Sequence, residues 1–159
     1  FHAPLQEAAV RPSGVIHPEL VSLLATAGHG DRIVITDAGL RIPSHARRVD
    51  LGLTCGVPTV AQVLAAIKSD LVIEAAEVAE EFSAWAAETY AEVVEVLDAS
   101  PTGTRSHVDL MADMAQSAFA YVKTGDCAAY SSVVLTCGVS YLESAIAHYT
   151  EVHGRPPVL

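Results

Sequence analysis

The chain has 159 residues, of which 51% are hydrophobic, and this is enough for one domain with an apolar core but not for two. Its formal charge is −10 and no basic cluster exceeds the pair Arg47 and Arg48, which argues against a nucleic-acid partner. No apolar run approaches the roughly 20 residues that cross a bilayer, and the N-terminus lacks the features of a signal peptide, so we expect a cytoplasmic protein without a membrane partner.

The N-terminal part of the sequence predicts an extension, a helix and a strand. Residues 1–13 begin with Phe and show no usable periodicity, as expected of a processed or added end. The sequence His-Pro-Glu at 17–19 begins a helix, with proline in its first turn and apolar residues at helical spacing after it. Glycines at 28 and 30 end this helix, and the β-branched run 32–36 then predicts a buried strand that leads into a polar loop.

The middle of the chain continues this alternation. Residues 48–53 predict a second short strand, and Gly-Val-Pro at 56–58 opens a helix with one apolar face. Strand-like residues at 71–78 precede a helix, rich in alanine and glutamate, over 83–97. The turn residues Ser-Pro-Thr-Gly at 100–103 end this unit.

The C-terminal part predicts one more helix and two more strands. A sequence similar to a capping box at 106–109 starts the helix, and 118–124 and 132–136 predict the strands. The alternation favours a single α/β domain over 14–141, in which helices flank a central, largely parallel sheet. Ligands of such sheets bind in the loops beyond the carboxyl ends of the strands. Residues 142–159 form a C-terminal extension to which the sequence assigns no role.

Cysteine and glycine patterns indicate neither a metal nor a nucleotide. Cys55, Cys127 and Cys137 are odd in number and lack C-x-x-C spacing, so we expect reduced thiols and no metal site. The sequence contains neither G-x-G-x-x-G nor a Walker A motif. Nucleotide phosphate binding is therefore not indicated.

Three polar residues stand where apolar elements break: His29 after the first helix, Asp37 after the first strand and His107 at the start of a later helix. Each alone can be explained as a helix cap, a loop cap or an exposed first-turn side chain. A helix C-terminus favours imidazolium at His29, whereas a helix N-terminus disfavours it at His107. The two could supply a proton donor and a neutral partner, with Asp37 orienting one imidazole or holding a sugar hydroxyl. This hypothesis requires the three side chains to lie close together.

Tyr130, Ser131 and Ser132 lie between the last two predicted strands and bring hydroxyl groups and an aromatic face to a loop. This composition suits a sugar. The alternative is an ordinary turn with a half-buried ring. No local pattern supports a glycosidase with paired carboxylates.

A series of short motifs follows one order along the chain from about residue 14 to 141. They are Gly28-His29-Gly30-Asp31, 33–40, Ile42-Pro43, 48–51, Gly56-Val57-Pro58, Ala79-Glu80-Glu81, Ser106-His107, 124–127 and Leu135-x-x-Gly138-Val139. In this order the motifs resemble those of the D-ribose pyranase and L-fucose mutarotase family. The segment 37–43 is more similar to the ribose branch than to the fucose branch.

The resemblance implies an isomerase, without metal or organic cofactor, that interconverts pyranose and furanose forms or anomers of a free aldose, with D-ribose as the first choice. It implies that His29 is the proton donor and that Asp37, His107 and residues 130–132 bind the monosaccharide. Ser132 stands where the family has Asn, and a hydroxyl cannot offer the separate donor and acceptor of an amide. The sugar preference therefore stays open.

The resemblance also implies a homo-oligomer, either a ring based on pentamers, such as a decamer, or an octamer, with sites near subunit contacts. Three alternatives remain at this point. The protein could be a fucose-type mutarotase, an inactive sugar-binding protein accessory to uptake, or a purely structural assembly.

Overall fold

The computed structural model describes residues 14–158, so the extension expected over 1–13 lies outside the described residues. The strands are β1 (Arg32–Thr36), β2 (Arg48–Asp50), β3 (Ile73–Ala79), β4 (Gly103–Arg105), β5 (Ala120–Lys123) and β6 (Val133–Cys137). The helices are α1 (Pro18–Thr26), α2 (Val60–Lys68), α3 (Phe82–Trp85), α4 (Ala87–Leu97), α5 (His107–Ser117) and α6 (Leu142–His153). None of these helices is long and apolar enough to span a membrane.

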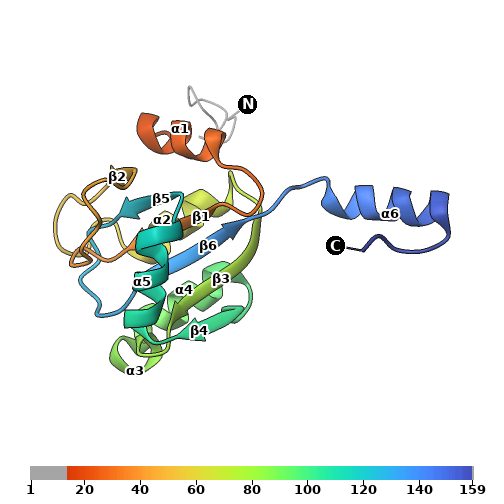
Figure 1. Ribbon diagram of the computed structural model, residues 1–159. Coiled ribbons are helices and arrows are strands. Elements are labelled where there is room, and N and C mark those ends of the chain that lie inside the picture. Colours follow the sequence, from red (N-terminus) through yellow and green to blue (C-terminus); the bar gives the residue numbers. More distant parts are fainter. Residues whose placement is uncertain (1–13, 159) are drawn as a thin grey trace, which may run out of the picture.

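The six strands form one sheet in the order β2-β5-β1-β6-β3-β4 (Figure 1). Parallel pairs join β2 to β5, β5 to β1 and β3 to β4, whereas β6 is antiparallel to both of its neighbours. Five strands therefore run in one direction, which confirms the largely parallel sheet that the sequence predicts. We call the side where these five strands end the carboxyl end of the sheet, and the side where they begin the amino end.

The middle of the sheet is buried on both faces. Ile33 and Ile35 of β1 belong to a large core that includes residues of α1, α2 and α4. Val34, between them, points to the other face and packs in a smaller core with Leu110 and Met114 of α5. A strand that is buried on both faces needs an unbroken apolar run, and this is why 32–36 could be recognised in the sequence.

Two parts of the sequence fold differently from the expectation. The helix predicted over 83–97 is divided into α3 and α4 at Ala86, whose backbone is not helical (φ −142°, ψ 59°). The turn residues predicted at 100–103 lead into the short strand β4, which pairs with the end of β3. The hydroxyl of Thr102 donates to the carbonyl of Ala76 (3.0 Å) and accepts from the N–H of the same residue (2.9 Å), which fixes the position of β4.

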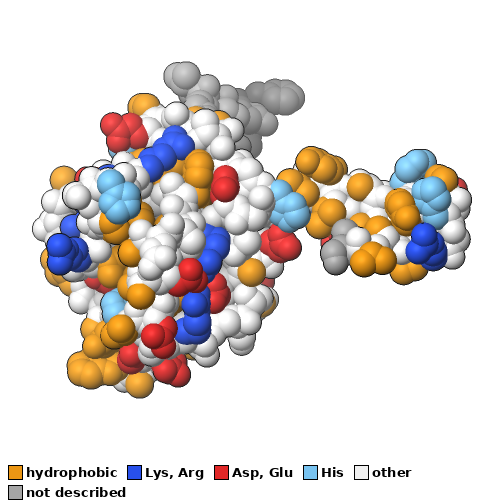
Figure 2. All heavy atoms as spheres, viewed as in Figure 1, with side chains coloured by type: hydrophobic (Ala, Val, Ile, Leu, Met, Phe, Trp, Pro, Cys, Tyr) orange, Lys and Arg blue, Asp and Glu red, His pale blue; other side chains and the backbone are white. Residues whose placement is uncertain are grey.

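The C-terminal extension forms the helix α6, which stands away from the sheet (Figure 1). None of its residues is buried. Figure 2 shows hydrophobic side chains along this helix without a covering layer in this view.

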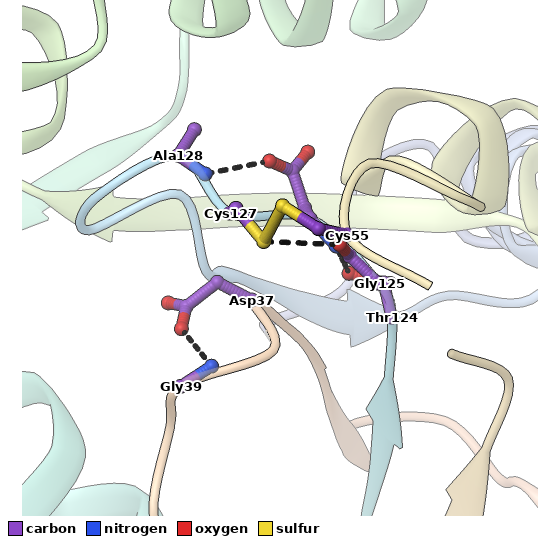
Figure 3. Close-up of a disulfide and its surroundings, with 8 residues drawn as sticks. Asp37, Gly39, Cys55, Thr124, Gly125, Cys127 and Ala128 are labelled. Atoms are coloured by element: carbon purple, nitrogen blue, oxygen red, sulfur yellow. Dashed lines mark hydrogen bonds between the residues drawn. A yellow bond between two sulfur atoms is a disulfide. The ribbon is translucent and has the colours of Figure 1, made fainter. Parts of the chain in front are cut away.

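Cys55 and Cys127 form a disulfide, which corrects the expectation of reduced thiols (Figure 3). The two residues lie 72 positions apart in loops that the backbone also joins, since the N–H of Gly56 donates to the carbonyl of Gly125 (2.6 Å). Cysteine number and spacing could not reveal this contact, because tertiary structure alone brings the loops together. Cys137 is free and buried, and burial raises the pKa of its thiol to about 11.

Candidate active site

Five of the six predicted site residues lie at the carboxyl end of the sheet. Asp37 directly follows β1, and Tyr130, Ser131 and Ser132 directly precede β6. Because β1 and β6 are antiparallel neighbours, with Ile35 opposite Val133, the end of one strand meets the start of the other. His107, the first residue of α5, reaches the same place because it follows β4.

Hydrogen bonds hold the side chain of Asp37. The backbone N–H of Gly39 donates to Oδ1 of Asp37 (2.9 Å) (Figure 3). The hydroxyl of Ser132 donates to Oδ2 of Asp37 (3.1 Å). Ser132 also accepts from the backbone N–H of Asp37 (3.3 Å). An ionised carboxylate can accept about four hydrogen bonds, so Asp37 keeps acceptor positions for the hydroxyl groups of a ligand.

Three rings form a wall next to Asp37. The ring of Tyr130 lies edge-on between those of Trp85 (5.5 Å between centroids) and His107 (5.1 Å). The backbone of Tyr130 has a positive φ of 59°, which costs a residue with a side chain about 1–2 kcal/mol. Strain of this kind persists where the surrounding structure fixes it and is common at ligand sites.

The site contains two buried polar atoms that have no hydrogen-bond partner in the described part of the chain, Nδ1 of His107 and the hydroxyl of Ser131. The backbone of His107 is held by Glu81, whose Oε2 accepts from its N–H (2.9 Å), and by Ser106, which caps α5. Buried polar atoms of this kind are rare unless water or a ligand satisfies them. The carboxyl end of the sheet therefore has polar groups available to a bound molecule.

A cavity of about 480 Å³ lies beside these groups. Its lining comprises Asp37, Gly39, Leu40, Arg41, Trp85, His107, Ala129 and Tyr130. The volume falls within the range of small-molecule sites. A neighbouring cavity of about 450 Å³ includes both cysteines of the disulfide and none of the predicted site residues.

His29, the sixth predicted site residue, lies at the amino end of the sheet in the turn between α1 and β1. Its Nε2 is 2.8 Å from Oε2 of Glu74, and the two side chains are 47% and 49% exposed. The backbone N–H of Gly30 donates to the carbonyl of Cys137 (2.8 Å), which attaches this turn to the end of β6. Since an ionised carboxylate only accepts hydrogen bonds, Nε2 of His29 carries the hydrogen in this contact.

The expected proximity of His29 to Asp37 and His107 is not found within one chain. His29 precedes β1 and Asp37 follows it, and a five-residue strand spans about 13 Å. This separation is too large for a direct contact or for a relay through a single water molecule. The sequence placed each residue correctly at a break between elements. His29 and Asp37, however, stand at the two opposite ends of the same strand, β1, and are therefore far apart.

Glu74 and Trp85 belong to these arrangements but were not among the candidate residues. Glu74 lies 45 positions from His29, and only the pairing of β3 with β6 brings its strand to the amino end. No local pattern reveals such a contact. Trp85 offered one signal, because it is the only tryptophan of the chain and stands in a segment otherwise rich in alanine and glutamate.

A cavity at the carboxyl end of an α/β sheet, lined by a carboxylate and aromatic rings, defines a domain that binds a small polar molecule. Residues 11–140 match the RbsD / FucU transport protein family, and the chain belongs to this family. The resemblance inferred from the ordered motifs is thereby confirmed.

Individual relatives support this assignment. A D-ribose pyranase of Paracidovorax citrulli is 39% identical over 132 residues, which make up 83% of this chain and 100% of the relative. A D-ribose pyranase of Variovorax paradoxus is 36% identical over 141 residues, with the same coverage of both chains. The structure of Bacillus subtilis RbsD complexed with D-ribose matches with a TM-score of 0.74 at 28% identity, covering 79% of this chain and 95% of that one.

Proposed function

We propose that this protein is a D-ribose pyranase, a cytoplasmic isomerase that interconverts the pyranose and furanose forms of free D-ribose without a metal or organic cofactor. The observation that carries the proposal is the cavity of about 480 Å³ lined by Asp37, His107 and Tyr130, where a carboxylate with remaining acceptor positions and aromatic rings surround space for a monosaccharide. The names of the relatives support the choice of ribose.

The reaction needs only proton transfers. Opening the cyclic hemiacetal removes the proton of the anomeric hydroxyl and returns a proton to the ring oxygen as the C–O bond breaks. Closure by a different hydroxyl reverses both transfers, so atoms and electrons balance within the sugar. A positioned acid/base group contributes about 10²–10⁴-fold to such a step. In this scheme Asp37 and His107 hold the sugar hydroxyl groups, and His29 transfers the proton.

This role of His29 requires a second copy of the chain. His29 lies at the amino end of the sheet and the cavity at the carboxyl end, so one copy cannot bring them together. A homo-oligomer in which His29 of one copy covers the cavity of another would complete the site. The family's expected ring-like assembly suits this arrangement. Glu74 then positions His29 by accepting the hydrogen of Nε2, which leaves Nδ1 toward the sugar.

Ser132 favours one alternative, a protein that binds a sugar without isomerising it. The family has Asn at this position, and Ser132 keeps only part of what an amide offers, the hydrogen bond that it donates to Asp37. The retained bond supports an intact binding site. What Ser132 lacks is the amide group with which Asn would form hydrogen bonds to the sugar.

Saturation-transfer NMR on D-ribose tests the proposal. We expect the protein to accelerate exchange between pyranose and furanose signals, and His29→Ala to slow this exchange about 100-fold while ribose still binds. His45→Ala, which removes another exposed histidine, is the matched control and should leave the rate unchanged.

Three results would count against parts of the proposal. Ribose binding without exchange in the unmodified protein would establish the binding-protein alternative. If the protein neither binds ribose nor accelerates its exchange, a ribose site is ruled out altogether. An unchanged rate in His29→Ala would remove His29 from the mechanism.

A further inference from the structure

Within residues 14–158, the helix α6 stands apart from the other helices and strands (Figure 1). It lies beyond the family match, begins five residues after β6 ends, and has no buried residue. An isolated helix of this length is marginal in water, and most helical stability in proteins comes from packing an apolar face. A stable α6 therefore needs a surface on which to pack.

One face of α6 is apolar. Its residues recur at the spacing of a helical stripe; they are Leu142, Ala145, Ile146, Tyr149 and Val152. Ala145 and Val152 are exposed and the other three are half-buried. Figure 2 shows hydrophobic side chains along this helix. Ala147 and Glu151 lie on the opposite face, so the helix has one surface suited to a protein contact and one suited to water.

The position of α6 indicates which part of a second copy its apolar face can reach. The segment that carries α6 leaves the body from Cys137, at the end of β6, and the carbonyl of Cys137 accepts from the N–H of Gly30 beside His29. The proposed function sets His29 against the carboxyl end of a second copy. The helix therefore starts next to the contact that the shared site requires.

The carboxyl end presents an exposed apolar rim that could receive the helix. Trp85 is 68% exposed and Val108, which follows His107, is 74% exposed. Figure 2 shows hydrophobic side chains gathered around α3, the helix that ends at Trp85. Arg41, which lines the same cavity, has no ion pair in the described part of the chain, and Glu143 at the flank of α6 has none either.

The distances permit this contact. The ring centroid of Tyr130 lies 5.5 Å from that of Trp85 and 5.1 Å from that of His107. The ring of Trp85 on the rim is therefore within about 11 Å of the imidazole of His107 in the cavity. The four residues 138–141 between β6 and α6 can span up to about 14 Å. A helix that begins so close to one copy's His29 reaches the rim around the cavity in which that His29 acts.

We propose that α6 is a clamp between copies, whose apolar face packs on Trp85 and Val108 of a second copy and covers the rim of its sugar site. The inference rests on the proposed function, which sets His29 of one copy over the cavity of another. The occupant of the apolar face is thus a second copy of this chain.

Tryptophan fluorescence tests the clamp, because Trp85 is the only tryptophan. In the full-length oligomer we expect emission typical of a covered ring. Ile146→Asp should shift the emission to longer wavelength and raise the dissociation constant between copies about 10- to 100-fold, the effect of losing one buried aliphatic side chain. Ala147→Asp introduces the same charge on the opposite face and should change neither. Equal behaviour of the two variants would overturn the proposal.

Mixed oligomers test whether the contact is made between chains. A Trp85→Phe chain with an intact α6 is co-expressed with an Ile146→Asp chain, which holds the only tryptophan but cannot dock its own helix. Emission at shorter wavelength than that of the Ile146→Asp chain alone is expected. No shift, or the same shift when the Trp85→Phe chain also carries Ile146→Asp, would overturn docking between copies.

Ribose exchange, measured on the same samples, separates this inference from the proposed function. A protein that accelerates exchange while Trp85 stays exposed to solvent overturns the clamp and leaves the function intact. A covered Trp85 without ribose exchange overturns the function, while α6 remains a contact between copies.

Discussion

The pair formed by His29 and Glu74 joins two elements that are distant in sequence at the amino end of the sheet. Their contact of 2.8 Å fixes the hydrogen on Nε2 only as long as residue 74 is a pure acceptor. An amide at this position could donate as well as accept, and it would no longer select one tautomer. Glu74 is therefore a positioning residue in the proposed mechanism, since it acts through His29.

We predict that Glu74→Gln lowers kcat for ribose exchange about tenfold, a part of the acid/base contribution, with little change in KM. NMR exchange rates over a series of ribose concentrations separate kcat from KM and provide the measurement. A purely structural role would lower the melting temperature and leave kcat per folded chain unchanged.

Asp113 holds α5 on the sheet through two arginines. Oδ2 of Asp113 accepts from Nη2 of Arg32 and from Nη2 of Arg105, each at 2.9 Å. The hydrogen bonds from these guanidinium groups lower the pKa of Asp113 to about 2 from its ordinary value of 3.8. A carboxyl group with a lowered pKa in the folded state stabilises the protein above its unfolded pKa, and this stability is lost as the pH falls from about 4 to 2.

Asp113→Asn should therefore lower the free energy of unfolding by about 1 kcal/mol at pH 7, a small value because the side chain is 35% exposed and screened by solvent. The difference from the unmodified protein should shrink as the pH approaches 2. Thermal unfolding at a series of pH values measures this, with Glu92→Gln on exposed α4 surface as the control. A difference that stays constant from pH 7 to pH 2 would show that the charge of Asp113 is not its source.

At the scale of elements, Ser106 connects local helix chemistry to the site. Its hydroxyl accepts from the N–H of Asp109 (3.2 Å) and donates to Oδ2 of the same residue (2.8 Å), so it caps α5. His107 is the first residue of that helix. The cap thus fixes both the start of α5 and the imidazole that faces the cavity.

Ser106→Ala should destabilise the protein by about 1 kcal/mol and also slow ribose exchange. Thr59→Ala is the matched variant, because Thr59 forms the capping box of α2 away from the cavity. It should have a similar cost in stability and leave exchange unchanged. Thermal unfolding and NMR exchange on both variants provide the comparison, and equal loss of activity in the two would contradict a specific role for the α5 cap.

The elements that the sequence could predict are those whose signals are local. The apolar run of β1 and the proline near the start of α1 identify those elements directly. The strand β4 depends on pairing with β3, and its residues Gly103 and Thr104 alone resemble a turn. The site divides in the same way: Asp37 and His107 stand at visible element breaks, whereas the contact of His29 with Glu74 depends on long-range strand pairing.

At the scale of the whole molecule, the two halves of the proposed site lie at opposite ends of one sheet. Mixing variants tests this directly. We predict that co-assembly of His29→Ala and Asp37→Asn chains restores exchange to about a quarter of the unmodified rate, since random mixing gives one intact site in four. Each variant alone should be almost inactive.

The matched control for this mixing combines Asp37→Asn with His107→Ala. Both residues belong to the same end of the same copy, so no mixture of these two chains contains an intact site. Recovery in this control would contradict the assignment of both residues to one copy's cavity. Absence of recovery in the first mixture would contradict a site shared between copies.

The position of β1 between His29 and Asp37 also affects how many sites an assembly contains. Under the shared-site proposal, copies that close on themselves complete one site per chain. An open row leaves an unused histidine at one terminus and an unused cavity at the other. Specific activity per chain would then be highest in closed assemblies, where each chain contributes its histidine to one site and its cavity to another, and it would fall as open rows become shorter.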